Sequence, residues 1–281
     1  RKTESSEEPK TATSKSKPRN QEVPPEARKF MAMALRLARR RLGRTSPNPV
    51  VGAVIVKDGV VVGEGYHRAA GEPHAEVEAI RAAGSNAHGA EMYVTLEPCN
   101  HHGRTPPCTQ AILEAGIKKV WYGMRDPNPG VRGGGAQTLR EAGIEVVGHV
   151  IEQRCSRINE VYITNVTLKR PFVYLKLAMS LDGRIATRTG ESHWITSDAA
   201  RRKVHRLRDR VSAIMVGIGT ILADNPSLTT RLPEGGGIDP VRIVADSKLR
   251  TPLDAKIFND VSPAGVIIAC LLYTSPSPRD S

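Results

Sequence analysis

Hydrophobic positions along this chain follow two periods, one typical of helices and one typical of strands. Apolar residues recur at helical spacing over residues 27–42, which predicts an amphipathic helix packed on a core. Residues 50–56 and 60–65 form two apolar runs around Lys57-Asp58-Gly59, a sequence typical of a β-hairpin turn. We expect helices that begin near His74, Cys108 and Ala136, and strands at residues 92–96, 118–124 and 144–150. Because helices alternate with strands, the pattern predicts a three-layer α/β/α sandwich.

A second α/β pattern follows the first. Residues 151–168 predict a helix that leaves the first domain, and Lys169-Arg170-Pro171 predicts a joint because proline ends helices. Beyond the joint we expect a helix from Ser197 to about Arg210 and strands at residues 172–178, 212–216, 241–245 and 265–269. Residues 1–26 contain almost no apolar residues, so we expect a disordered tail there.

The composition narrows the class of protein. A chain of 281 residues with 39% hydrophobic content can bury two cores. No apolar run reaches the ~18 residues of a membrane span, and the N-terminal stretch lacks the apolar core of a signal peptide. The few cysteines do not form a disulfide framework, which favours a reducing cytoplasm.

The net charge of +12 is compatible with nucleic-acid binding, since basic surfaces release counterions from phosphate backbones. Much of the excess lies in the tail and in residues 39–41 and 201–203, which on helices are usually solvated faces. Aromatic residues make up 4% of the chain, so stacking platforms for single strands are scarce. We therefore expect neither a nucleic-acid nor a membrane partner, and a phosphorylated small molecule accounts for a basic site equally well.

One set of residues points to zinc chemistry. Pro73-His74-Ala75-Glu76, Pro98-Cys99 and Pro107-Cys108 supply three soft metal ligands, His74, Cys99 and Cys108, and one carboxylate, Glu76. Three protein ligands leave a fourth zinc position to a water, which then ionises near neutral pH instead of near ~15.7. Glu76 can take a proton from that water and pass it to a leaving amine, as in the zinc deaminases.

The spacing agrees with this interpretation. Residues two apart do not share a helix face, so His74 and Glu76 can converge only at a helix start, where Pro73 ends an extended segment. Cys108 likewise opens a predicted helix, and helix starts favour thiolates. Lone histidines and cysteines are usually ordinary core residues. Four matching residues in this order instead predict a catalytic zinc site.

The loop between the two cysteines is longer than in most zinc deaminases, and with its flanks it resembles a known family. The chain is similar to the bifunctional riboflavin-biosynthesis deaminase/reductases over about residues 27–269. The motifs of the first half are Gly71-Glu72-Pro73-His74-Ala75-Glu76, Thr95-Leu96-Glu97-Pro98-Cys99-Asn100-His101-His102-Gly103-Arg104-Thr105-Pro106-Pro107-Cys108 and Asp126-Pro127-Asn128-Pro129.

The resemblance implies two reactions. The first is hydrolytic removal of the 2-amino group of 2,5-diamino-6-ribosylamino-4(3H)-pyrimidinone 5′-phosphate, and NADPH then reduces the ribosyl chain. It implies a cytidine deaminase-like sandwich with substrate residues Asn48, His67, Asp126 and Asn128. Without the resemblance, each of these four would pass for a turn residue.

The second half resembles the dihydrofolate reductase-like half of the same family. The motifs are Leu175-Lys176-Leu177-Ala178-Met179-Ser180-Leu181-Asp182-Gly183-Arg184, Glu191-Ser192-His193-Trp194-Ile195-Thr196 and Gly217-Ile218-Gly219-Thr220-Ile221-Leu222-Ala223-Asp224-Asn225-Pro226. The implied NADPH-binding residues are Ala178, Trp194, Thr220, Asp224 and Ser247. The implied reductase substrate residues are Lys176, Ser192, Arg208, Leu228 and Arg231.

We therefore expect a tail (1–26), a zinc deaminase domain (27–150), a connecting helix and linker (151–170), the N-terminal part of a reductase domain (171–269) and a non-native tail (270–281). The last segment departs from the family, and we expect the reductase half to be incomplete and inactive. Three alternatives stay open: a nucleoside, guanine or tRNA deaminase, a non-catalytic zinc-stabilised binding module, and a stand-alone reductase. A homo-oligomer is compatible with the sequence.

Overall fold

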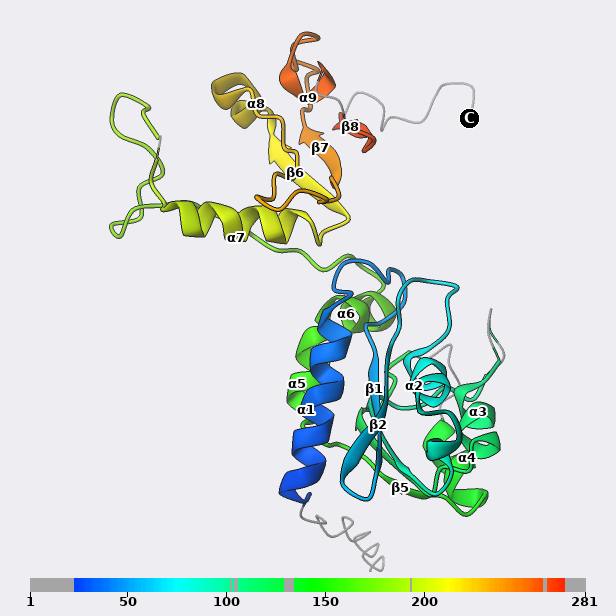
Figure 1. The fold of residues 1–281 in the computed structure, drawn as a ribbon. Coiled ribbons are helices and arrows are strands. Elements are labelled where there is room, and N and C mark those ends of the chain that lie inside the picture. Colours follow the sequence, from blue (N-terminus) through cyan, green and yellow to red (C-terminus); the bar gives the residue numbers. More distant parts are fainter. Residues whose placement is uncertain are drawn as a thin grey trace, which may run out of the picture.

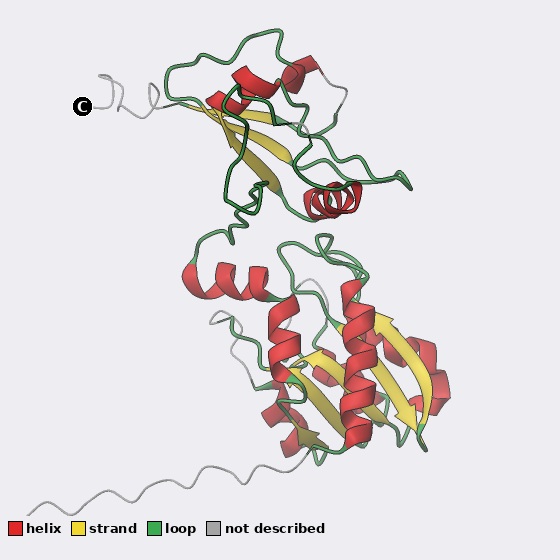
Figure 2. Ribbon diagram, turned by 90° about the vertical axis from the view of Figure 1, so that its left-hand side faces the viewer, coloured by secondary structure: helices red, strands yellow, loops and turns green. Residues whose placement is uncertain are grey.

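The computed structural model describes residues 23–101, 103, 106–128, 134–192, 194–259 and 262–270. Of the tails expected at 1–26 and 270–281, residues 1–22 and 271–281 lie outside the described residues, whereas Pro25 and Glu26 belong to the first helix. Two sheets organise the described chain, one in each half (Figures 1 and 2). No described helix is long and apolar enough to cross a membrane.

The first sheet has the strand order β2-β1-β3-β4-β5. Strand β1 runs antiparallel to β2 and β3, whereas β3, β4 and β5 run parallel. Helices α1 and α5 pack on one face and α2, α3 and α4 on the other (Figure 1), so the predicted α/β/α sandwich is confirmed. The strands are β1 Gly52–Lys57, β2 Val60–Tyr66, β3 Glu91–Leu96, β4 Lys119–Met124 and β5 Glu145–Val147. The helices are α1 Pro25–Arg39, α2 Ala75–Ala83, α3 Cys108–Glu114, α4 Gly135–Glu141 and α5 Glu152–Ile158, with a short 3-10 helix at Gly84–Ala87.

Local sequence explains the ends of these elements. The β1–β2 turn is two residues long, with positive φ at both Asp58 and Gly59, as the hairpin signal predicts. Helix α1 begins at Pro25, two residues earlier than expected, because proline suits the first helical turn. Strand β5 stops at Val147, short of the expected residue 150, because the chain turns at His149 with a φ of 65°.

The connector was expected as one helix over 151–168 but consists of two. Helix α5 ends at Ile158 and α6, Glu160–Leu168, follows after Asn159. The Asn159 side chain accepts a hydrogen bond from the Val50 backbone N–H (2.9 Å) and donates one to the Val50 carbonyl (3.0 Å). The break therefore coincides with an anchor between the connector and the segment that enters β1.

The second half contains a parallel three-stranded sheet in the order β6-β7-β8, made of Ala213–Gly217, Val241–Ala245 and Val266–Ala269. Its helices are α7 Asp198–Arg208, α8 Ile218–Asp224 and α9 Lys256–Asn259. Its core is small and centres on Ile221, Val244 and Ile257.

The strand expected at residues 172–178 is not formed, although all of these residues are described. A strand needs a neighbour to take up its backbone hydrogen bonds. The three strands of this sheet pair with one another, and Val173 and Leu175 remain 75% and 84% exposed. The apolar pattern of this segment predicts a strand that the structure does not contain, so this prediction is wrong.

The two halves meet through an ion pair. One Nη of Arg44 lies 2.6 Å from the Asp209 carboxylate, and the other donates to the Asp209 backbone carbonyl at 2.5 Å. Gly43 lies so close to Arg210 that an added Cβ would come within 2.6 Å of its backbone. The turn after α1 thus touches the end of α7.

Candidate metal centre and substrate site

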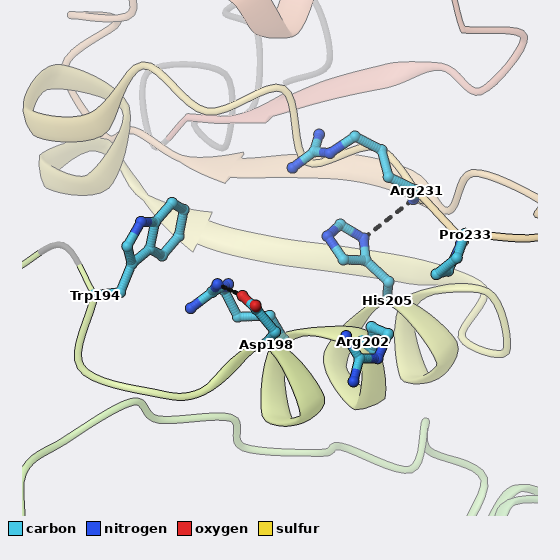
Figure 3. A pocket seen from close by; sticks show the side chains of 7 residues that line it. Trp194, Asp198, Arg202, His205, Arg231 and Pro233 are labelled. Atoms are coloured by element: carbon cyan, nitrogen blue, oxygen red, sulfur yellow. Dashed lines mark hydrogen bonds and ion pairs between the residues drawn. The ribbon is translucent and has the colours of Figure 1, made fainter.

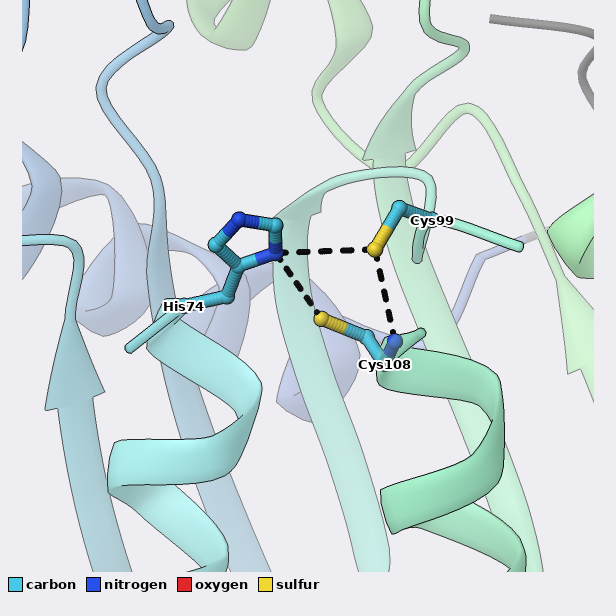
Figure 4. A group of neighbouring side chains, drawn as sticks. All are labelled: His74, Cys99 and Cys108. Atoms are coloured by element: carbon cyan, nitrogen blue, oxygen red, sulfur yellow. Dashed lines mark hydrogen bonds between the residues drawn. The ribbon is translucent and has the colours of Figure 1, made fainter. Parts of the chain in front are cut away.

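The three predicted ligands converge at one edge of the first sheet (Figure 4). The Nδ1 atom of His74 lies 3.1 Å from the Cys108 Sγ and 3.5 Å from the Cys99 Sγ. All three donor atoms lie within 4.8 Å of one another. A tetrahedral zinc with Zn–S near 2.3 Å and Zn–N near 2.0 Å separates nitrogen and sulfur donors by about 3.5 Å. The donor set and its spacing therefore fit zinc.

The topology explains why these ligands meet. Strands β3 and β4 are parallel, with Leu96 opposite Met124, so the loops after them leave the same edge of the sheet. Cys99 lies in the first of these loops, and Cys108 is the first residue of α3. His74 is the N-cap of α2, which packs closely on β2 because β2 carries Gly65 at the contact. A Cβ on Gly65 would come within 2.3 Å of the Ala75 carbonyl oxygen.

Glu76 lies in the first turn of α2 and its side chain is buried, with 4% of the residue exposed. Burial raises the pKa of Glu76 to about 7, and the Cys99 thiolate adds to the increase. The hydrogen bond from Cys108 lowers the pKa of Cys99, and the hydrogen bond to Cys99 raises the pKa of His74. A buried carboxyl that gains and loses a proton near neutral pH is suited to proton transfer.

Two of the expected substrate residues contact each other beside the ligands. The Nδ1 atom of His67 lies 3.1 Å from the Pro73 carbonyl, and its Nε2 atom lies 3.1 Å from the Asn48 Nδ2 atom. A carbonyl can only accept, so Nδ1 carries the proton and Nε2 accepts from Asn48. Burial lowers the pKa of His67, which favours this neutral form. The His67 ring packs edge-on against the His74 ring, with 5.4 Å between the two ring centroids.

The other two expected substrate residues follow β4. The Oδ1 atom of Asp126 accepts hydrogen bonds from the Asn128 backbone N–H and from the Tyr162 hydroxyl, both at 2.9 Å. The Glu97 N–H donates to the Met124 carbonyl at 2.8 Å, which joins this loop to the loop of Cys99. The structure therefore brings Asp126 and Asn128 to the edge that carries the metal ligands.

Sequence reasoning missed the residues that support these loops. The buried Glu97 accepts a hydrogen bond from the Ala136 N–H at the start of α4, and Tyr162 reaches Asp126 from the connector. No local pattern marks either contact, since each joins residues far apart in the sequence. His102, Arg104 and Thr105 of the loop between the cysteines lie outside the described residues.

The expected reductase residues are more dispersed. Arg208 donates to the Thr229 carbonyl at 2.7 Å, and Arg231 donates to the Thr229 hydroxyl at 3.0 Å, so both guanidinium groups converge on Thr229. Leu228, the residue before it, is buried. Trp194 and Arg231 line an open pocket of about 360 Å³ (Figure 3), together with Asp198, Arg201, Arg202, His205 and Pro233. Arg201 lies over the Trp194 ring at 4.2 Å.

The remaining reductase residues are spread over several segments of the second half. Thr220 and Asp224 belong to α8, and Ser247 follows β7. Lys176 and Ala178 lie in the segment that forms no strand, and Ser192 lies just before Trp194.

The sandwich fold and its His-Cys-Cys centre define a zinc-binding domain of the cytidine deaminase type, joined to a second α/β half. In agreement, the zinc-binding region of cytidine and deoxycytidylate deaminases matches residues 24–124, and the RibD C-terminal domain matches residues 171–274. The chain belongs to the RibD family of riboflavin biosynthesis proteins.

The similarity extends over both halves. The riboflavin biosynthesis protein RibD of Actinobacillus pleuropneumoniae is 50% identical over 85% of this chain, and that of Aquifex aeolicus is 49% identical over 85%. The chain spans 63% and 67% of the length of these two relatives.

A solved structure shows the same architecture. The Thermotoga maritima diaminohydroxyphosphoribosylaminopyrimidine deaminase/5-amino-6-(5-phosphoribosylamino)uracil reductase superimposes with a TM-score of 0.82 at 48% identity, over 90% of this chain and 72% of that one. The dihydrofolate reductase-like assignment of the second half agrees with this likeness.

Proposed function

We propose that the first half is a zinc-dependent deaminase that removes the 2-amino group of 2,5-diamino-6-ribosylamino-4(3H)-pyrimidinone 5′-phosphate by hydrolysis. The observation that carries this proposal is the convergence of His74, Cys99 and Cys108 beside the buried Glu76. The proposed domain comprises residues 27–150, joined by residues 151–170 to a reductase part at 171–269.

Each residue has a distinct task. Zinc held by the three ligands would lower the pKa of a water toward neutrality and supply the nucleophile. Glu76 accepts a proton at its carboxylate and delivers one to the departing amine, because its buried side chain lies in the first turn of α2, two residues after the ligand His74. Asn48 and the neutral His67 orient the pyrimidine, and Asp126 and Asn128 bind the ribose phosphate portion through its hydroxyls.

The proposed substrate is favoured by two features outside the metal ligands, the long loop between the cysteines and the second α/β half. A nucleoside, guanine or tRNA deaminase needs neither the long loop between Cys99 and Cys108 nor a second α/β half. The name of the Thermotoga relative carries both a pyrimidine deaminase and a uracil reductase, which favours the diaminopyrimidine phosphate over those alternatives.

We further propose that the second half is the N-terminal part of an NADPH-dependent reductase domain for the deaminated product. Arg208 and Arg231 would meet the substrate phosphate, since arginine binds phosphate through two parallel hydrogen bonds. Ala178, Trp194, Thr220, Asp224 and Ser247 would line NADPH, and Lys176, Ser192 and Leu228 would complete the substrate side. We propose a cytoplasmic location, a small-molecule substrate and no nucleic-acid partner.

The test is ammonia release by zinc-loaded protein. We expect turnover of the diaminopyrimidine phosphate and no turnover of cytidine, guanine or tRNA at equal concentration. Ammonia release from one of the alternatives, without release from the diaminopyrimidine phosphate, would overturn the substrate assignment. Zinc binding without any ammonia release would favour the non-catalytic binding module.

A further inference from the structure

The connector helix α6 reaches into the substrate side of the deaminase half. The Tyr162 hydroxyl donates to the Asp126 Oδ1 at 2.9 Å, and Asn128 is also within hydrogen-bonding reach of that hydroxyl. Tyr162 lies in α6 of the connector, beyond the proposed deaminase domain at residues 27–150, so this contact comes from outside that domain.

The contact fixes Asp126 in a way that its own loop cannot. The Asn128 N–H also bonds the same Oδ1, but this bond lies within one turn and moves with the loop. The bond from Tyr162 ties the carboxylate to a helix. That helix is anchored in turn, because Asn159, directly before α6, forms two hydrogen bonds with the Val50 backbone, close to Asn48.

Tyr162 is neither a residue of the hydrophobic core nor an ionised group at neutral pH. Helix α6 contains no fully buried residue, so the Tyr162 ring is not part of a dense core. Burial and the neighbouring Asp126 raise the pKa of Tyr162, so the phenol stays protonated and acts as a donor. A neutral donor beside an acidic acceptor holds that acceptor in one rotamer.

We propose that Tyr162 is a positioning residue for substrate binding: it holds the Asp126 carboxylate, and through it the Asn128 loop, in the orientation that receives the ribose phosphate portion of the pyrimidine. This inference rests on the proposed deaminase function. It assigns a task to the connector, which thereby shapes the deaminase site as well as joining the two halves.

The experiment compares the zinc-loaded chain with Tyr162→Phe, which removes one hydroxyl and keeps the ring. We expect KM for the diaminopyrimidine phosphate to rise about tenfold, the order expected for loss of one hydrogen bond to a charged group. We expect kcat and zinc content to stay unchanged. The matched control is Tyr174→Phe, since the Tyr174 hydroxyl donates a 2.9 Å hydrogen bond to Glu160, the first residue of α6, and does not contact Asp126.

A double variant separates positioning from direct contact with substrate. If Tyr162 acts through Asp126, then Tyr162→Phe adds nothing to the KM of Asp126→Ala. Additive effects would mean that Tyr162 acts by another route and would overturn the proposal, as would an unchanged KM in Tyr162→Phe while the parent chain is active. A parent chain that neither binds nor deaminates the pyrimidine phosphate would instead overturn the proposed function, and the inference with it.

Discussion

At the scale of single residues, the candidate centre depends on three ligands and one carboxyl with separate tasks. Burial raises the pKa of Glu76 to about 7, although the residue lies only two positions from a ligand. Glu76 does not belong to the group of three side chains that could hold a metal, so we expect it to move protons and not to bind the metal. Substitution of the ligands should therefore abolish zinc binding, whereas substitution of the carboxyl should slow deamination without loss of zinc.

Glu76→Gln tests the proton-transfer role. The amide keeps the shape of the carboxyl but cannot carry the proton, so we expect full zinc content and ammonia release reduced ~10²-fold or more. Zinc analysis and the ammonia assay on one preparation measure both quantities. Near-normal turnover would show that another group moves the proton.

The two cysteines test the metal. In the double variant Cys99→Ser/Cys108→Ser we expect the stoichiometric zinc of the parent chain to be lost, because neutral hydroxyls replace two thiolate ligands. Cys270→Ser is the control, since Cys270 lies beyond β8 beside the Ser247 carbonyl. Zinc retained by the double variant would contradict the ligand assignment.

At the scale of elements, the position of α2 on β2 decides where His74 and Glu76 lie. Gly65 permits that approach, and a methyl group there would collide with the Ala75 carbonyl and the Ala79 amide, at 2.3 and 2.4 Å. Gly65 is required because there is no room for a side chain at this position. Its backbone conformation does not require glycine, since its φ is not in the left-handed region.

We expect Gly65→Ala to lower the free energy of unfolding by about 1–3 kcal/mol, the usual range for overpacking. Because the methyl group displaces the N-terminus of α2, zinc affinity should fall with it. Thermal unfolding and zinc titration measure the two effects. Gly265→Ala is the control, since a Cβ there meets nothing within 4 Å, and equal behaviour of the two variants would contradict the argument.

At the scale of the whole molecule, the two halves are joined by the connector and by the Arg44–Asp209 ion pair. Burial alone would raise the pKa of Asp209, but hydrogen bonds from the Ile238 N–H and from Arg44, with the charges of Arg44 and Arg210, lower it below its usual value. A lowered folded pKa means that this carboxylate stabilises the contact at neutral pH and ceases to do so as pH falls through that pKa.

We therefore expect the contact between the halves to persist at neutral pH and to weaken below the ordinary aspartate value of 3.8. Small-angle X-ray scattering or proteolysis at residues 169–171 measures the separation of the halves. Asp209→Asn should separate them already at neutral pH and remove the acid-dependent step. If the two halves of Asp209→Asn still separate in acid to the same extent as those of the parent chain, another group controls the contact.

The sequence by itself determined what depends on near neighbours. The hairpin turn at Asp58-Gly59, the helices that begin at Ala75 and Cys108, and the alternation that gives the sandwich all follow from short-range patterns, because backbone conformation is set within a few residues. The set of His74, Cys99, Cys108 and Glu76 could be predicted for the same reason, since each residue stands beside a proline or at a helix start.

Only the tertiary structure decided what depends on distant partners. Tyr162 with Asp126, Asn159 with Val50 and Arg44 with Asp209 join residues from 36 to 165 positions apart, and no local pattern records such contacts. The apolar run at 172–178 shows the converse, because its pattern suits a strand but a strand forms only where another strand accepts its hydrogen bonds. Local propensity selects the conformations available to a segment, and long-range pairing determines which of them the folded chain adopts.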